Sequence, residues 1–95
     1  MAGYVIAQLL HVSDAAGFEE YRSKVAATVE RYGGKFLVRG GEVQVLEGDW
    51  PGRTVVLEFD SAARAREWYD SAEYRPLLEL RKRCAETRLI IIEGV

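Results

Sequence analysis

The stretch from residue 4 to residue 11, YVIAQLLH, limits the possible folds most, because it is typical of a strand that is apolar on both faces. Alternate residues from Val5 to Leu9 form one wholly apolar face. The residues between them form a second face, which is apolar except for Gln8. A strand of this kind needs cover on both sides, whereas a strand with one face in water alternates apolar and polar residues.

The first half of the chain predicts one helix and a hairpin. Ser13 or Asp14 can cap the start of the helix, and Gly33 suits the left-handed position at its end. Two short strands follow at residues 35–39 and 42–47. They are expected to form a tight hairpin through the Gly-Gly pair at residues 40 and 41, because glycines accept the positive φ angles of such turns.

The second half predicts two more strands around an interrupted helical region. Pro76 disfavours helical geometry at the preceding residue and removes a backbone donor, so we expect a break in the helix there. The expected elements are a core strand at 53–60, a helix at 62–70, a break at 71–75, a helix at 76–85 and a buried strand at 87–95.

The order of these elements predicts an α+β, ferredoxin-like domain with helices on one face of an antiparallel sheet. The 95 residues suit a single domain over residues 1–95. The other sheet face is expected to carry apolar side chains, among them Tyr4, Ile6, Leu10 and Val56. No predicted segment is left to cover that face, so we expect a homodimer in which two sheet faces meet or close into one barrel.

Composition excludes several classes of function. The net charge of −2 argues against a protein that binds nucleic acids or anionic membranes through clustered basic residues. One cysteine, Cys84, and one histidine, His11, leave no internal disulfide, thiolate cluster or histidine-rich metal site. No apolar run approaches the ~20 residues that span a bilayer, and no signal-peptide pattern is present. We expect a cytoplasmic protein with no metal and no organic cofactor.

Several segments resemble a known family. The stretches FLVRGGEV followed by LEG, and WYDSAEY followed by a leucine and an arginine, are the most specific. With YVIAQLLHVSDAAGFEEYR and RLIIIEGV, they resemble the bacterial family called domain of unknown function 1330, in the dimeric α/β-barrel superfamily. The resemblance implies a ferredoxin-like fold and a barrel made by two subunits. It implies no particular reaction, since that superfamily includes cofactor-free monooxygenases, isomerases and stress-response dimers.

Strand alternation places Gln8 and Glu58 on the face opposite the helices. If Phe36 and Val38 pack beneath the helices, Arg39 joins these two polar residues. Arg39 would then bind an anionic or carbonyl oxygen of a small ligand, and Glu58 would act as a base or orient Arg39. In the alternative interpretation, Arg39 and Glu58 form a structural ion pair in a non-enzymatic dimeric module, such as a stress-response protein.

Further candidates lie on the helices and at a strand end. Tyr69 and Tyr74 flank the expected helix break, where a cleft could open, and Arg81 follows them at helical spacing as a second cation. His11 is a candidate acid or base because its unperturbed pKa lies near neutrality. We therefore expect a small oxygenated or anionic ligand in a cleft between sheet and helices, with cofactor-free proton transfer as the candidate reaction. The candidate ligand-binding residues are Arg39, Gln8, Tyr69, Tyr74 and Arg81, and the candidate catalytic residues are Glu58 and His11.

Overall fold

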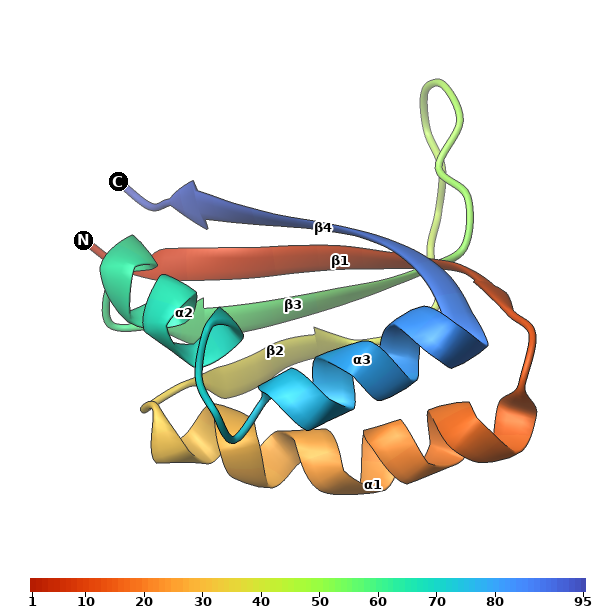
Figure 1. The fold of residues 1–95 in the computed structure, drawn as a ribbon. Helices are drawn as coiled ribbons and strands as arrows, with labels where there is room; N and C mark the ends of the chain where they lie inside the picture. The colour runs from red at the N-terminus through yellow and green to blue at the C-terminus, as the bar shows by residue number, and fades with distance from the viewer.

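The computed structural model describes residues 1–95, which form one four-stranded sheet with three helices packed against one of its faces (Figure 1). The elements are β1 (Gly3–Val12), α1 (Ala15–Arg31), β2 (Lys35–Arg39), β3 (Arg53–Phe59), α2 (Ala62–Tyr69), α3 (Arg75–Cys84) and β4 (Ala85–Glu93). The strand order is β2-β3-β1-β4, and every neighbouring pair is antiparallel. This arrangement confirms the predicted α+β, ferredoxin-like fold.

The helices begin and end near the predicted positions. Asp14 caps α1, because its side chain accepts a hydrogen bond of 3.1 Å from the backbone N–H of Gly17. Gly33 follows the end of α1 with a φ of 76°, the left-handed conformation that glycine adopts easily. No helix in the structure is both long enough and apolar enough to cross a membrane.

The core lies between the sheet and the helices. Val5, Leu57 and Phe59 of the sheet are almost completely buried against Val29 of α1 and Trp68 of α2. The Trp68 ring lies 5.6 Å from the Phe59 ring and 4.2 Å from the Tyr74 ring, measured between centroids. This packing removes the three largest buried side chains of the core from water together, and it fixes α2 and the start of α3 on the sheet.

The expected helix break lies between Tyr69 and Arg75. Ser71 stabilises it from inside: its hydroxyl donates to the Trp68 carbonyl at 2.8 Å and accepts from the Tyr74 N–H at 3.1 Å. Pro76 occupies the first turn of α3, where a missing N–H leaves no hydrogen bond unmade.

The predicted strand at residues 42–47 is wrong. Residues 40–52 form a loop that rises from the sheet, and β2 pairs directly with β3 (Figure 1). Val43, Val45 and Leu46 are exposed in this loop. The alternating pattern of residues 42–47 suits a strand, but a strand also needs a neighbour for its backbone groups, and this segment has none.

A bulge in β2 corrects the predicted face of Arg39. Phe36 pairs with Leu57, but the register then shifts, so that Val38 pairs with Val56 and Arg39 pairs with Val55. An extra residue in one strand reverses the face of every side chain after it. Phe36 and Val38 therefore lie on opposite faces, and Arg39 lies on the helix face, away from Glu58.

The sheet face away from the helices, called here the outer face, carries apolar side chains, as predicted. Ile90, Ile92 and Val38 are 53%, 49% and 41% exposed on it, although they are large aliphatic residues. No helix lies over this face (Figure 1). Its apolar members are Tyr4, Ile6, Val38, Val56, Ile90 and Ile92.

Candidate functional site: an arginine-lined cleft

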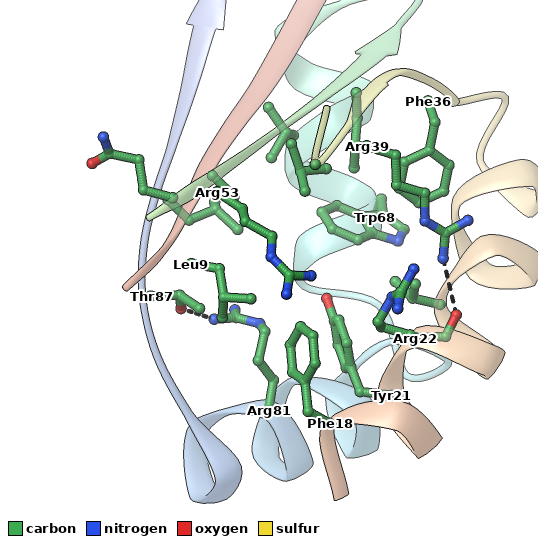
Figure 2. A pocket seen from close by; sticks show the side chains of 18 residues that line it. Leu9, Phe18, Tyr21, Arg22, Phe36, Arg39, Arg53, Trp68, Arg81 and Thr87 are labelled. Carbon is green, nitrogen blue, oxygen red and sulfur yellow. Dashed lines mark hydrogen bonds between the residues drawn. The ribbon is translucent and has the colours of Figure 1, made fainter. Parts of the chain in front are cut away.

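A cavity of about 110 Å³, called here the cleft, lies between the sheet and helices α1 and α3 (Figure 2). Eleven of its 18 lining residues are hydrophobic, and the polar remainder includes four arginines but no aspartate or glutamate. The lining consists of Val5, Ala7, Gln8, Leu9, Phe18, Tyr21, Arg22, Val25, Phe36, Arg39, Gly40, Arg53, Val55, Leu57, Trp68, Arg81, Thr87 and Leu89. An apolar cavity whose only charges are positive is suited to an anion with an apolar body.

The arginines come from four different elements. Arg22 lies on α1, and its ion pair with Glu19, at 3.7 Å, is largely exposed to solvent. None of the ion pairs in the structure includes Arg39, Arg53 or Arg81. Three guanidinium groups of the cleft therefore have no carboxylate to balance their charge.

Arg81 is the most buried of these cations, with 6% of its surface exposed. One terminal nitrogen donates to the Thr87 hydroxyl, but the buried Nε has no hydrogen-bond partner. Burial disfavours its charge, yet the Tyr74 and Tyr21 phenols nearby raise the pKa of Arg81 overall, so the side chain stays charged. A buried charge with an unsatisfied donor is costly in a native protein unless another group compensates for it.

Tyr21 supplies a hydroxyl to the same wall. Its oxygen lies 2.7 Å from the hydroxyl oxygen of Tyr74, which is completely buried. Burial, together with the neighbouring Tyr74, raises the pKa of Tyr21 well above its usual value. The Tyr21 phenol is therefore protonated at neutral pH, and it can donate a hydrogen bond.

Arg39 braces the fold instead of pairing with Glu58. Its Nη2 donates to the Arg22 carbonyl at 3.0 Å, and its guanidinium lies 4.2 Å from the centre of the Phe36 ring. These contacts tie β2 to α1 at one end of the cleft (Figure 2). The predicted ion pair with Glu58 is absent because the bulge in β2 directs the two side chains to opposite faces.

Glu58 has other partners on the outer face. Its carboxylate accepts a hydrogen bond of 3.2 Å from the Tyr4 hydroxyl and lies 3.3 Å from Lys35 Nζ. The hydrogen bond and the negative charge of Glu58 raise the pKa of Tyr4. Glu58 does lie opposite the helices, as predicted, but it is not part of the cleft lining.

The remaining predicted residues divide between the cleft and other places. Arg81, Arg39 and Gln8 border the cleft. Tyr74 is buried in the core, and Tyr69 packs against Trp68, with 6.3 Å between the ring centroids. His11, at the exposed end of β1, does not line the cleft either.

Sequence reasoning missed most of the residues that line the cleft, among them Arg53, Tyr21 and Phe18. Arg53 could have been identified from the sequence, since it alternates with Val55 and Leu57 and must share their helix-facing side. Tyr21 and Phe18 are part of an ordinary apolar stripe on α1, and nothing in that stripe distinguishes a cleft wall from the core.

The fold is shared with several solved structures. The methylated RPA0582 protein has a TM-score of 0.76 at 19% identity, covering 99% of this chain and 81% of that chain. A dimeric ferredoxin-like protein of unknown function from Thermobifida fusca has a TM-score of 0.63 at 14% identity, with coverage of 99% and 92%. SnoaB, a cofactor-independent oxygenase from Streptomyces nogalater, has in its N63A mutant a TM-score of 0.61 at 17% identity, with coverage of 98% and 91%. At these identities the likeness establishes the fold alone.

The sequence itself gives the closer assignment. No curated protein matches it significantly. One family model, described as domain of unknown function DUF1330, matches residues 2–95 and confirms the resemblance seen in the FLVRGGEV and WYDSAEY segments. The chain belongs to the DUF1330 family.

Proposed function

We propose that this protein binds a small oxygenated or anionic molecule in the cleft, and that it does so as a homodimer whose subunits meet through the outer face. One observation carries the ligand proposal: Arg39, Arg53 and Arg81 line an apolar cavity that contains no carboxylate. Like charges that line one cavity without a counter-ion repel one another, and a bound anion relieves that repulsion.

The size of the cleft supports a small ligand. Its volume of about 110 Å³ is somewhat below the ~150 Å³ of an engineered cavity that holds benzene. Its apolar walls favour burial of a hydrocarbon body, and its guanidinium groups can bind oxygens through forked hydrogen bonds. The shape and the charge therefore support the same class of ligand.

For any acid–base chemistry in the cleft, the candidate group is Tyr21 and not Glu58 or His11. The cleft lining contains no carboxylate and no imidazole, and the Tyr21 phenol is the group there that can exchange a proton. Its raised pKa keeps the phenol protonated at neutral pH, so it serves there as a hydrogen-bond donor and not as a base. One solved relative in fold is described as a cofactor-independent oxygenase, which is compatible with chemistry performed by side chains alone.

The homodimer is supported by the outer face. Exposed Ile90 and Ile92 continue an apolar surface that water would otherwise cover. A second copy of the same face is a complementary cover, since a two-fold interface brings the same patch of both subunits together. The Thermobifida fusca protein of similar fold is described as dimeric.

The alternative function is a non-enzymatic dimeric module. In that interpretation an Arg39–Glu58 pair specifies assembly, but each of these residues has a different partner in the structure. The unbalanced arginines of the cleft also remain without a role. We therefore favour ligand binding.

A thermal-shift screen of small organic anions and their neutral counterparts tests the proposal. We expect at least one compound to raise Tm in the wild-type protein, because ligands that bind only the folded state stabilise it. Arg81→Met should abolish that increase. Arg66→Met is the matched control, since Arg66 pairs with Asp70 on an exposed face of α2 at 2.8 Å. A library that never shifts Tm would contradict the proposal.

A further inference from the structure

Three hydrogen-bond donors from three different elements meet in the part of the cleft away from Arg39 (Figure 2). Arg53 reaches in from β3, Arg81 from α3 and Tyr21 from α1 (Figure 2). Leu9 and Phe18 lie beside them (Figure 2). No side-chain acceptor with a negative charge is part of this wall, and the Nε of Arg81 is buried with no partner.

We propose that the ligand is a small organic monocarboxylate with an apolar body, and that Arg81, Arg53 and Tyr21 bind its carboxylate. This inference rests on the proposed function and names the chemical class of its ligand. A carboxylate offers two oxygens in one plane, which suits the planar fork of a guanidinium. Its remaining lone pairs can accept from the second arginine and from the phenol.

Arg81 is the primary anchor in this arrangement. Its guanidinium is held in place by the Thr87 hydroxyl and lies 5.9 Å from the centre of the Tyr21 ring. Thr87 engages one terminal nitrogen. The buried Nε has no partner, so Arg81 is not fully hydrogen-bonded in the free protein, and a carboxylate in the cleft can bind its guanidinium through the terminal nitrogens.

Tyr21 acts as a neutral donor beside this anchor. The Tyr74 hydroxyl, at 2.7 Å, restricts the position of the Tyr21 oxygen. Tyr21 can donate a hydrogen bond to the ligand while its oxygen accepts a hydrogen bond from the Tyr74 hydroxyl. A row of two phenols therefore supports the carboxylate without adding a negative charge to the wall.

The lining favours a monocarboxylate over inorganic phosphate. A phosphate has oxygens on every side and would have to place some of them against Leu9 or Phe18, whose side chains offer no donor. Burying an unpaired ionic oxygen is strongly unfavourable. An organic carboxylate presents its charge on one side only, and its hydrocarbon body can pack against these apolar walls.

Isothermal titration calorimetry with two matched pairs of compounds tests the inference. The carboxylates are isovalerate and benzoate, and their neutral counterparts are isovaleramide and benzamide, with inorganic phosphate as the third kind of probe. We expect at least one carboxylate to bind at least about tenfold more tightly than its own amide, because hydrogen bonds to charged groups are stronger than neutral ones. Phosphate should bind more weakly than the better carboxylate.

Variants that remove single arginines test whether the carboxylate of the ligand binds in the cleft. Arg81→Met should weaken carboxylate binding by roughly 10- to 100-fold and should leave amide binding nearly unchanged. Arg53→Met should weaken it less, since Arg53 is exposed. That variant also covers the case in which Arg81→Met fails to fold. Arg66→Met, on the outside of α2, should match the wild type.

The outcomes separate this inference from the proposed function. If the amides bind as tightly as the acids, or phosphate binds best, the cleft is a ligand site and the monocarboxylate assignment is overturned. Carboxylate binding that survives both Arg81→Met and Arg53→Met overturns the assigned donors. If no probe binds and the wider screen also finds no ligand, the proposed function itself fails.

Discussion

The hydroxyl oxygens of Tyr21 and Tyr74 lie 2.7 Å apart, and this hydrogen bond joins the middle of α1 to the residue that precedes α3. Tyr74 also packs against the Trp68 ring in the core, whereas Tyr21 forms part of the cleft wall. The pair therefore connects the packing of the core to the position of a donor in the cleft. A disturbance of either phenol should affect both stability and ligand binding.

Tyr21→Phe and Tyr74→Phe form a double-mutant cycle on this bond. Each single variant should lower the free energy of unfolding by about 1–2 kcal/mol, because it leaves the other hydroxyl with one partner fewer in a buried place. The double variant should lower the free energy of unfolding by less than the sum of the two single effects, with a coupling energy of roughly 0.5–1.5 kcal/mol. Urea denaturation followed by circular dichroism measures all four proteins. Strictly additive effects would show that the two hydroxyls act independently.

Alkaline pH should destabilise the protein through Tyr21. Burial and Tyr74 raise the pKa of Tyr21 in the folded state well above the ordinary tyrosine value of 10.0, so deprotonation is easier in the unfolded chain. The stability from this group is fully present below the unfolded pKa and falls as pH rises above it towards the folded pKa. The free energy of unfolding measured between pH 8 and pH 11 should therefore decline. Tyr21→Phe should decline less steeply over the same range, and an unchanged slope would contradict the assignment.

The fold was accessible from the sequence because its main signals are periodic. The two-faced apolar strand at residues 4–11, the helical stripe through Val25 and Val29, and the break before Pro76 each have one simple structural explanation. The bounds of the observed elements differ from the predicted ones by no more than two residues. Residues 42–47 are the exception, since their alternation is as regular as that of a strand but no neighbouring strand is available.

The cleft was harder to predict from the sequence than the fold, because it depends on strand register and on tertiary packing. Nothing in the sequence of β2 marks the bulge between Phe36 and Val38, and this bulge alone decides which face Arg39 occupies. Arg81 was found from helical spacing, but its burial follows from how α3 packs on β4 and α1. The meeting of Tyr21 with Tyr74 joins residues 53 positions apart, which no local pattern encodes.

The outer face should mediate dimerisation. Ile90→Lys combined with Ile92→Lys places two charges among the apolar side chains there, and burying them against a second copy would be strongly unfavourable. Size-exclusion chromatography with light scattering should show a dimer for the wild type and a monomer for this variant. Glu79→Lys, at an exposed position of α3 on the helix side of the sheet, is the matched control and should remain dimeric. A wild type that is monomeric at micromolar concentration would contradict the dimer.

Arg81 should show the trade-off between stability and function that is typical of a binding site. In the free protein its side chain is buried, has no carboxylate partner and leaves Nε unsatisfied. Replacing buried charges by apolar side chains of similar volume is often neutral or stabilising by roughly 1–4 kcal/mol.

Arg81→Met should therefore unfold at the same or a higher urea concentration than the wild type in the absence of ligand, while any ligand-induced increase in Tm disappears. Arg66→Met should change the free energy of unfolding by less than about 0.5 kcal/mol, because the Arg66–Asp70 pair is exposed. A large loss of stability in Arg81→Met, with ligand binding retained, would show that Arg81 serves the fold. Unchanged or higher stability in Arg81→Met, together with loss of ligand binding, would show that Arg81 serves anion binding.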